Sequence, residues 1–209
     1  MIDMVIPDGN EDEFISMALK LGLEGLCFLY SGSPGMIPNS HLKTFIGRKG
    51  GGVKNAVLTV SLLPPDARAA LERHDIEMVV GVEQDSRKDF MKSRNSGLNQ
   101  VLCEIASKKK KIIGFDVSSL IISKGKRRAL LLGRMMQNVI LCRKYSVKMA
   151  LCSFARTPWQ LRNPKDLAAV GMMIGMDAAE ARAAVLAAGE RIILNFEGKS
   201  DLAEGIERM

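Results

Sequence analysis

Short apolar runs alternate with amphipathic stretches along nearly the whole chain, and this alternation constrains the fold more than any other feature. A strand followed by a helix and a second strand favours parallel pairing with a crossover helix. We predict seven strands, near residues 2, 27, 58, 79, 113, 150 and 193. The order predicts a single α/β domain over residues 1–196, followed by a polar tail over residues 197–209.

Local signals mark the ends of several elements. Two pairs have the spacing of a capping box and one has the Asn-Pro start of a helix: Asn10 with Glu13, Asp177 with Glu180, and Asn163 with Pro164. Residues 39–48 predict a weak helix. Residues 192–196, which are apolar and follow an alanine-rich helix, predict the last strand.

Two architectures fit this order of elements. One is an open, doubly wound parallel sheet, and the other is a (β/α)8 barrel. A barrel of this kind usually has about 250 residues, so 209 residues would make a small one. Its eighth strand would have to lie between Asn39 and Ile76. The pattern of elements alone leaves both architectures open.

Positive charge is concentrated in one part of the sequence. Between Asp85 and Lys165 there are 19 Lys/Arg and 4 Asp/Glu, a balance of +15, whereas the remaining 11 basic and 19 acidic residues give −8. No acidic residue occurs between Asp116 and Asp166. Clustered positive charge displaces counterions from a phosphate backbone, so this segregation favours a polyanionic partner such as a nucleic acid.

The loops that follow parallel strands lie at one end of the fold, which is the end where ligands usually bind. Three such loops are basic, and we predict that they converge on one rim as a binding surface for a polyanion. The candidate residues are Arg87, Lys88, Lys92, Arg94, Lys124, Lys126, Arg127, Arg128, Arg156 and Arg162. The run Lys108 to Lys111 should lie at the opposite end, where cations favour the carbonyls at the end of a helix.

Few residues are suited to catalysis. His41 and His74 are the only histidines, and both are expected at the surface, which excludes a histidine-rich metal centre. Asp116, at a strand end, is the best single candidate for a catalytic acid or base, but such an aspartate more often caps local amides. Trp159 could stack on a base, although packing of its loop onto the fold is the commoner role. We therefore predict no catalytic residue, no bound cofactor and no metal site.

Other features bear on the setting of the chain. The four cysteines, Cys27, Cys103, Cys142 and Cys152, lie in apolar surroundings without a CxxC pair, which is typical of reduced buried thiols. No apolar run approaches the roughly 20 residues of a membrane span, and the first residues do not form a signal peptide. A cytoplasmic location is the expectation.

Three ordered segments resemble a known family. They read SGLNQVLCEIASKKKKIIGFDVSSLI, then RMMQNVILCRKYSVKMALCSFA, then LRNPKDLAAVGMMIGM. Together they are similar to protein component 3 of archaeal ribonuclease P, the counterpart of a eukaryotic subunit of about thirty kilodaltons. The similarity extends over residues 95–194. Asn99-Gln100 departs from the family pattern, which often has a histidine at the second position.

The resemblance implies a fold and a function. It implies a TIM-barrel-like parallel barrel related to the metal-dependent PHP phosphoesterases but lacking their metal site. Since the first 90 residues match the family poorly, the barrel could be one strand–helix unit short. The implied function is that of a non-catalytic subunit of ribonuclease P, whose RNA uses Mg²⁺ to remove the 5′ leader of precursor tRNA. Implied partners are that RNA, precursor tRNA, protein component 2 and the other protein subunits.

Two further functions remain open from the sequence. The chain could be a stand-alone PHP-like or amidohydrolase-like metal-dependent phosphoesterase that uses Asp3 or Asp116. It could also be a general basic RNA-binding module without a fixed RNA partner. Metal content and phosphoesterase activity of the purified chain would separate the first of these from a ribonuclease P subunit.

Overall fold

The computed structural model describes residues 1–34, 37, 40–50, 55–85, 87–89, 91 and 94–207, with side chains as far as residue 198. Within this part of the chain the strands are β1 (Ile2–Val5), β2 (Gly25–Tyr30), β3 (Lys43–Lys49), β4 (Leu58–Leu62), β5 (Met78–Val80), β6 (Ile112–Asp116) and β7 (Lys148–Cys152). The α-helices are α1 (Glu11–Lys20), α2 (Ala67–Glu72), α3 (Gln100–Lys108), α4 (Val117–Ile122), α5 (Gly125–Lys144), α6 (Pro164–Met173) and α7 (Ala178–Glu207). Two short 3₁₀ helices are η1 (Val82–Gln84) and η2 (Pro158–Gln160). None of the described helices is long and apolar enough to cross a membrane.

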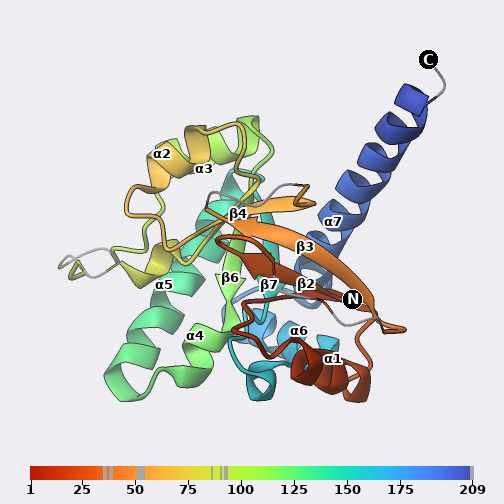
Figure 1. Ribbon diagram of the computed structural model, residues 1–209. Coiled ribbons are helices and arrows are strands. Elements are labelled where there is room, and N and C mark those ends of the chain that lie inside the picture. Colours follow the sequence, from red (N-terminus) through yellow and green to blue (C-terminus); the bar gives the residue numbers. More distant parts are fainter. Residues whose placement is uncertain are drawn as a thin grey trace.

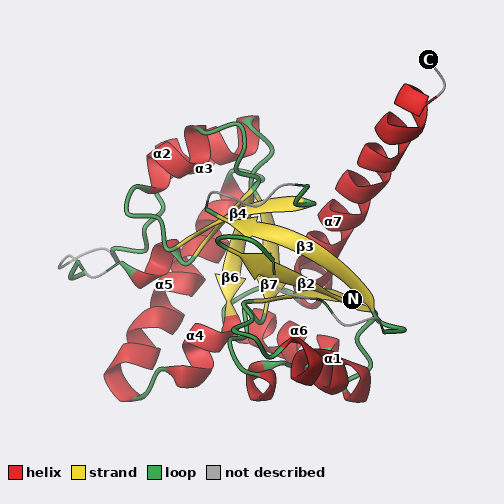
Figure 2. Ribbon diagram, viewed as in Figure 1, coloured by secondary structure: helices red, strands yellow, loops and turns green. Residues whose placement is uncertain are grey.

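The strands form one parallel sheet in sequential order, β1 to β7, which curls into a nearly closed barrel (Figures 1 and 2). Its two edges meet at a single bridge, where Val5 pairs with Ala155 and the Ile6 amide donates to the Ala155 carbonyl at 2.8 Å. This confirms the TIM-barrel-like prediction, with seven strands in the described chain. A strand does lie between Asn39 and Ile76, as a barrel requires, and it is β3.

Asp3 completes the seam between the two edges. Its Oδ1 accepts hydrogen bonds from the Met4 and Ser153 amides, both at 2.8 Å, and the Ser153 hydroxyl donates to the Met4 carbonyl at 3.3 Å. The carboxylate thus takes the place of a ladder hydrogen bond between β1 and β7. Because Asp3 is fully buried, desolvation raises its pKa to about 6.

Alternate residues of each strand build two cores. One set faces the barrel interior, and the other packs against the surrounding helices. The interior is tightly filled: a Cβ placed on Gly114 would lie 2.7 Å from Val80 Cγ2, and one on Gly47 would lie 2.9 Å from Cys27 Sγ. The barrel is therefore a packed core rather than a channel.

Two predicted elements are wrong. Residues 43–49 form β3 instead of a weak helix; Thr44, Phe45 and Ile46 favour a strand, but polar flanks conceal the alternation. Residues 192–196 belong to α7 instead of a last strand. Two of their apolar side chains contact the barrel: Ile192 is fully buried in the interior core, and the Phe196 ring lies edge-on to Phe45 at 5.6 Å between centroids.

The helix α7 crosses the amino-terminal end of the barrel before projecting away from it (Figure 1). Asn195 Nδ2 donates to the Val57 carbonyl at 2.7 Å, just before β4, and Lys148 Nζ at the start of β7 pairs with Glu190 at 2.9 Å. The helix also runs without a break past residue 196, where the sequence predicts the end of the domain. The division into domain and tail stays a prediction.

Two of the three predicted helix starts are confirmed, and one is wrong. Asp177 and Glu180 form the predicted capping box, with the Glu180 amide donating to Asp177 at 2.8 Å and the Asp177 amide donating to Glu180 at 3.0 Å. Asn163 caps α6 by accepting from the Asp166 amide at 2.9 Å. Asn10 makes no cap for α1, so that capping box is wrong. Its side chain instead donates to the Arg156 carbonyl at 3.4 Å.

Candidate nucleic-acid interface

The carboxyl-terminal end of the barrel carries the predicted basic loops. Segment 83–96 follows β5, the junction of α4 and α5 follows β6, and segment 153–162 follows β7. Figure 1 shows α4, the start of α5 and α1 at this end, while α7 leaves the barrel at the other. The helix α4 was not foreseen from the sequence, since it has only six residues and begins within an apolar run.

Arg134 of α5 fastens the segment after β5. It is 2% exposed, and its guanidinium donates to the carbonyls of Glu83 (3.1 Å), Asp85 (2.6 Å) and Arg87. It also pairs with the Asp89 carboxylate at 2.8 Å. Nothing in the sequence separates this buried arginine from its exposed neighbours.

The fastening extends along the rest of the segment. Burial alone would raise the pKa of Asp89, but the Asn95 amide and Arg134 more than offset it and lower that pKa. Arg94 Nη1 donates to the Gly133 carbonyl at 2.9 Å, and Asn138 Nδ2 donates to the Ser96 carbonyl at 2.9 Å. A Cβ on Gly133 would lie 2.8 Å from Arg94 Cζ, so this contact needs glycine. The segment is thus held against α5 at several points.

The fastening places two basic loops along one helix. Residues 127 and 133 are six positions apart on α5, which corresponds to about 9 Å along its axis. The cations in the first turns of α5 and the segment that carries Arg87, Lys88 and Arg94 are therefore attached to the same helix, about two turns apart.

The candidate residues fall into two groups. Four use their side chains within the protein: Arg87 pairs with Asp85, Arg94 binds the Gly133 carbonyl, Arg128 donates to the Ser123 and Ile121 carbonyls, and Arg162 donates to the Trp159 and Leu161 carbonyls. Five are exposed, and their side chains have no hydrogen-bond or ion-pair partner among the described residues: Lys88, Lys124, Lys126, Arg127 and Arg156. Lys92 lies outside the described residues. The second group is the one available to an external anion.

The mouth of the barrel brings the loops after β5, β6 and β7 together. Gln84 Nε2 donates to Asp116 Oδ2 at 3.5 Å. Burial raises the pKa of Asp116 to about 6, while the Ser119 amide and the nearby charge of Arg156 oppose the rise. At the end of β3, burial lowers the pKa of Lys49, and the charge of Arg156 lowers it further. Lys49 therefore adds positive charge beside Arg156, and the charge of Asp8 partly balances it.

Of the two buried acidic residues at this end, Asp116 has a structural role, whereas the carboxylate oxygens of Glu83 have no hydrogen-bond partner among the described residues. Asp116 caps α4 by accepting from the Ser119 amide at 3.1 Å, which confirms its expected capping role. Glu83 is 1% exposed, and burial raises its pKa to about 8. Among the described residues, no group of three or more His, Cys, Asp or Glu side chains could hold a metal ion.

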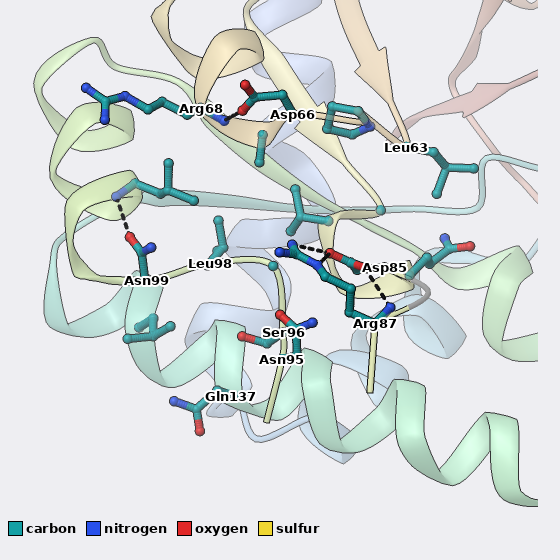
Figure 3. A pocket seen from close by; sticks show the side chains of 18 of the residues that line it. Leu63, Asp66, Arg68, Asp85, Arg87, Asn95, Ser96, Leu98, Asn99 and Gln137 are labelled. Atoms are coloured by element: carbon teal, nitrogen blue, oxygen red, sulfur yellow. Dashed lines mark hydrogen bonds and ion pairs between the residues drawn. The ribbon is translucent and has the colours of Figure 1, made fainter. Parts of the chain in front are cut away.

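A groove of about 1230 Å³ lies beside the fastened segment, between the loops after β4 and β5 and the helices α3 and α5. Figure 3 shows Asp66 and Arg68 on one wall, and Asn95, Ser96 and Gln137 on the other. Its arginines already have partners: Arg68 pairs with Glu72, and Arg87 pairs with Asp85. The cations outside the groove are therefore better placed to meet an anion.

The remaining sequence predictions can be located as well. Lys108 to Lys111 lie before β6, at the amino-terminal end as predicted, and Lys111 is buried there with Nζ bonded to the carbonyls of Arg73 (2.6 Å) and Ile76. His41 and His74 are exposed, and the four cysteines are free and buried, as expected. Trp159 is 78% exposed, so the prediction that it packs its loop onto the barrel is wrong. Its loop is held instead by Pro158 and Leu161, which are buried.

Comparison with known proteins identifies the family. The model of the family described as "RNase P subunit p30" matches residues 68–201. The chain belongs to this family. Ribonuclease P protein component 3 of Methanosarcina acetivorans is 36% identical over 141 residues, which are 67% of this chain and 56% of that protein. The counterpart in Methanococcoides burtonii is 29% identical over an alignment of 222 residues, covering 97% of this chain and 90% of that protein. The matched part thus spans little more than half the length of the Methanosarcina relatives.

Solved structures share the fold of this p30-family chain. One is a chain in the cryo-EM structure of archaeal Ribonuclease P with mature tRNA, with a TM-score of 0.73 and 20% identity over 93% of this chain and 91% of that one. Another is histidinol phosphate phosphatase from Lactococcus lactis, with a TM-score of 0.53 and 10% identity over 93% of both chains. At these identities the likeness concerns the fold alone, and it agrees with the expected TIM-barrel-like architecture.

Proposed function

We propose that this p30-family chain is a protein subunit of ribonuclease P and supports removal of the 5′ leader from precursor tRNA. Cleavage itself is assigned to the RNA of the particle, which uses Mg²⁺. The chain would contribute no catalytic residue and bind no cofactor or metal. The observation that carries this proposal is the set of unpaired cations held at one end of a family-p30 barrel, Lys88, Lys124, Lys126, Arg127 and Arg156.

The proposed mechanism is electrostatic. Lysine and arginine side chains that contact phosphates release counterions and stabilise folded RNA without reading its sequence. A cation that is already paired within the protein gains less from a phosphate, because the existing pair must first be broken. The unpaired cations should therefore provide most of the RNA contacts, and the fastened segment 83–96 should hold its share of them in place before RNA arrives.

The proposed partners follow from the family. They are ribonuclease P RNA, precursor tRNA within the particle, protein component 2 and the other protein subunits. The proposed location is the cytoplasm. The archaeal particle that contains a chain of the same fold is ribonuclease P with mature tRNA, which supports this set of partners without identifying the contacts of this chain.

Reconstitution tests the proposal. Ribonuclease P RNA from the same source and its other protein subunits are assembled with and without this chain, and cleavage of a 5′-labelled precursor tRNA is followed at low and at moderate Mg²⁺. The expected result is faster cleavage with the chain, especially at low Mg²⁺, because protein cations replace part of the ionic screening. Equal rates with and without the chain at every Mg²⁺ concentration would contradict the proposal.

The same preparation tests for a stand-alone phosphoesterase. The purified chain without RNA is analysed for bound metal and assayed on p-nitrophenyl phosphate with added Mn²⁺ or Zn²⁺. We expect neither metal nor activity, because Asp3 holds the seam of the barrel and Asp116 caps α4. Activity that is lost in both the Asp116→Asn and the Asp3→Asn variants would favour the enzyme instead.

A further inference from the structure

Trp159, the only tryptophan of the chain, is displayed to solvent. Its side chain is 78% exposed, although tryptophan is usually well buried. It lies in η2, on the loop that follows β7 at the carboxyl-terminal end of the barrel. An indole exposed to this degree adds little to the core, and its face is free to contact a ligand.

The loop beneath the indole is firmly built. Pro158 and Leu161 are buried on either side of it. Arg162 Nη1 donates to the carbonyls of Trp159 (2.9 Å) and Leu161 (2.7 Å), and the Arg156 amide donates to Gln160 Oε1 at 2.8 Å. A side chain presented from so well-bonded a loop loses little entropy when a ligand stacks on it.

The surroundings of the indole are polar and basic rather than apolar. The other apolar residues from Ser153 to Arg162 are buried, so Trp159 is the single exposed apolar group of this loop. Arg156 is exposed beside it and has no side-chain partner in the described chain. Lys49 approaches Arg156 from the end of β3. Acidic groups also lie on this side of the mouth: Asp116 is buried and caps α4, Asp8 acts on Lys49, and the acidic first turn of α1 belongs to a helix that contacts η2.

We propose that Trp159 is a stacking platform for one unpaired ribonucleotide, whose phosphate is bound by Arg156. This rests on the proposed function, and it adds a contact to a base where the cations alone would contact only the backbone. Every base has a π-face, so a stack of this kind is tolerant of sequence, and an arginine beside it supplies the charge that the phosphate needs. Unpaired nucleotides occur both in loops of ribonuclease P RNA and in the 5′ leader of precursor tRNA.

The composition of the loop around Trp159 favours an RNA partner over a protein partner. A tryptophan at the centre of a protein interface is typically surrounded by other apolar groups that exclude water. Here the exposed neighbours along the loop are Arg156 and Thr157, and the loop belongs to the segment that carries a balance of +15. This composition fits a phosphate next to a base better than an apolar protein surface.

Tryptophan fluorescence can be used to follow ligand binding at this position. Because the chain has no other tryptophan, its fluorescence reports on Trp159 alone. Titration with single-stranded decauridylate should quench it, whereas a ten-base-pair RNA duplex, whose bases are already stacked, should leave it nearly unchanged. Ribonuclease P RNA, leader-bearing precursor tRNA and mature tRNA are then compared. Quenching by the first indicates a loop of that RNA, and quenching by precursor tRNA but not by mature tRNA indicates the leader.

Variants separate stacking from a structural role. Trp159→Leu should weaken binding of the quenching RNA by about tenfold, and Trp159→Phe should weaken it less, because a benzene ring still stacks. Leu194→Ala, which changes another exposed apolar residue, on α7, should bind as wild type does. All three should unfold at the wild-type temperature, since neither altered side chain is buried.

Three results would overturn the stacking proposal alone. The first is a wild-type chain that stimulates cleavage but binds RNA no better than Trp159→Leu. The others are quenching by the duplex that is as strong as quenching by decauridylate, and quenching by protein component 2 but not by RNA. A wild-type chain that neither binds RNA nor stimulates cleavage would overturn the proposed function itself. The two failures are therefore distinguishable.

Discussion

The two ends of the barrel use the same kinds of residue in different ways. At the amino-terminal end α7 crosses the opening, and cations are joined to the protein: Lys111 to two carbonyls, Lys148 to Glu190, and Arg191 to Glu77. At the carboxyl-terminal end Lys88, Lys124, Lys126, Arg127 and Arg156 have no partner in the described chain. Paired cations occur at the carboxyl-terminal end as well, since Arg87, Arg94, Arg128 and Arg162 bond within the protein there, so the five exposed cations are the part of that end available to an anion.

The carboxyl groups at the two ends differ in burial. At the carboxyl-terminal end, burial raises the pKa of Asp116 to about 6 and that of Glu83 to about 8. At the amino-terminal end, the hydrogen bond from Arg143 lowers the pKa of Glu180 to about 2, and Arg73 lowers the pKa of Asp75. Ion pairs also stabilise exposed or partly exposed carboxylates at the carboxyl-terminal end, where Arg87 lowers the pKa of Asp85.

The largest effect on the free energy of unfolding is expected for Arg134, the buried cation that holds the segment after β5 at the mouth of the barrel. Arg134→Ala should lower the free energy of unfolding by about 3–5 kcal/mol, because it leaves Asp89 and three carbonyls without their donor. Arg191→Ala, whose side chain is 23% exposed, is the matched control and should cost much less. Urea denaturation measures both. An equal loss of unfolding free energy in the two variants would contradict the conclusion that Arg134 of α5 holds the segment after β5.

The next effect tests the two ends directly. Changing Lys88, Lys124, Lys126, Arg127 and Arg156 together to glutamine should raise the protein concentration needed for half-maximal precursor-tRNA cleavage by roughly 10- to 100-fold. The control changes five lysines of the amino-terminal end, Lys20, Lys43, Lys108, Lys109 and Lys110, and should stay within about twofold of wild type because that charge is screened from the RNA. A larger loss in the control than in the first variant would reverse the assignment of the two ends.

A smaller effect concerns pH. Glu83 has a folded pKa of about 8, far above its unfolded value, so the folded state binds the extra proton and stability falls as pH rises. Between pH 7 and pH 9 the loss should be about 1 kcal/mol. Glu83→Gln keeps the shape of the side chain without the ionisation. Thermal unfolding at both pH values should show a smaller drop for this variant, and an identical drop would mean that Glu83 is not the group responsible.

Much of the fold could be predicted from the sequence, and the predictions that failed did so for physical reasons. The buried strand β2 and the capped start of α6 were placed correctly, because a continuous apolar run and an Asn-Pro pair are local signals. Residues 192–196 were misread because two of their apolar side chains contact the barrel as part of a helix. The preceding alanine-rich turns propagate that helix through residues that would otherwise favour a strand.

The candidate site could be predicted only by its position. Strand order placed the loops with Arg87, Arg127 and Arg156 at one end, because parallel strands bring their carboxyl ends together. Which of these cations is free depends on contacts between distant segments. Arg134 and Arg127 look alike in the sequence, yet one is buried against segment 83–96 and the other is exposed. That distinction required the fold.

The salt dependence of RNA binding tests the central claim most directly. The dissociation constant for ribonuclease P RNA is measured over a range of KCl concentrations for wild type, the five-residue variant of the carboxyl-terminal end and the five-residue control. Each phosphate contact contributes about 0.7 to 0.9 to the slope of log K against log salt. The first variant should therefore have a slope smaller by about 3.5 to 4.5, and the control should match wild type. A wild-type slope in the first variant, or a reduced slope in the control alone, would contradict RNA binding at this end of the barrel.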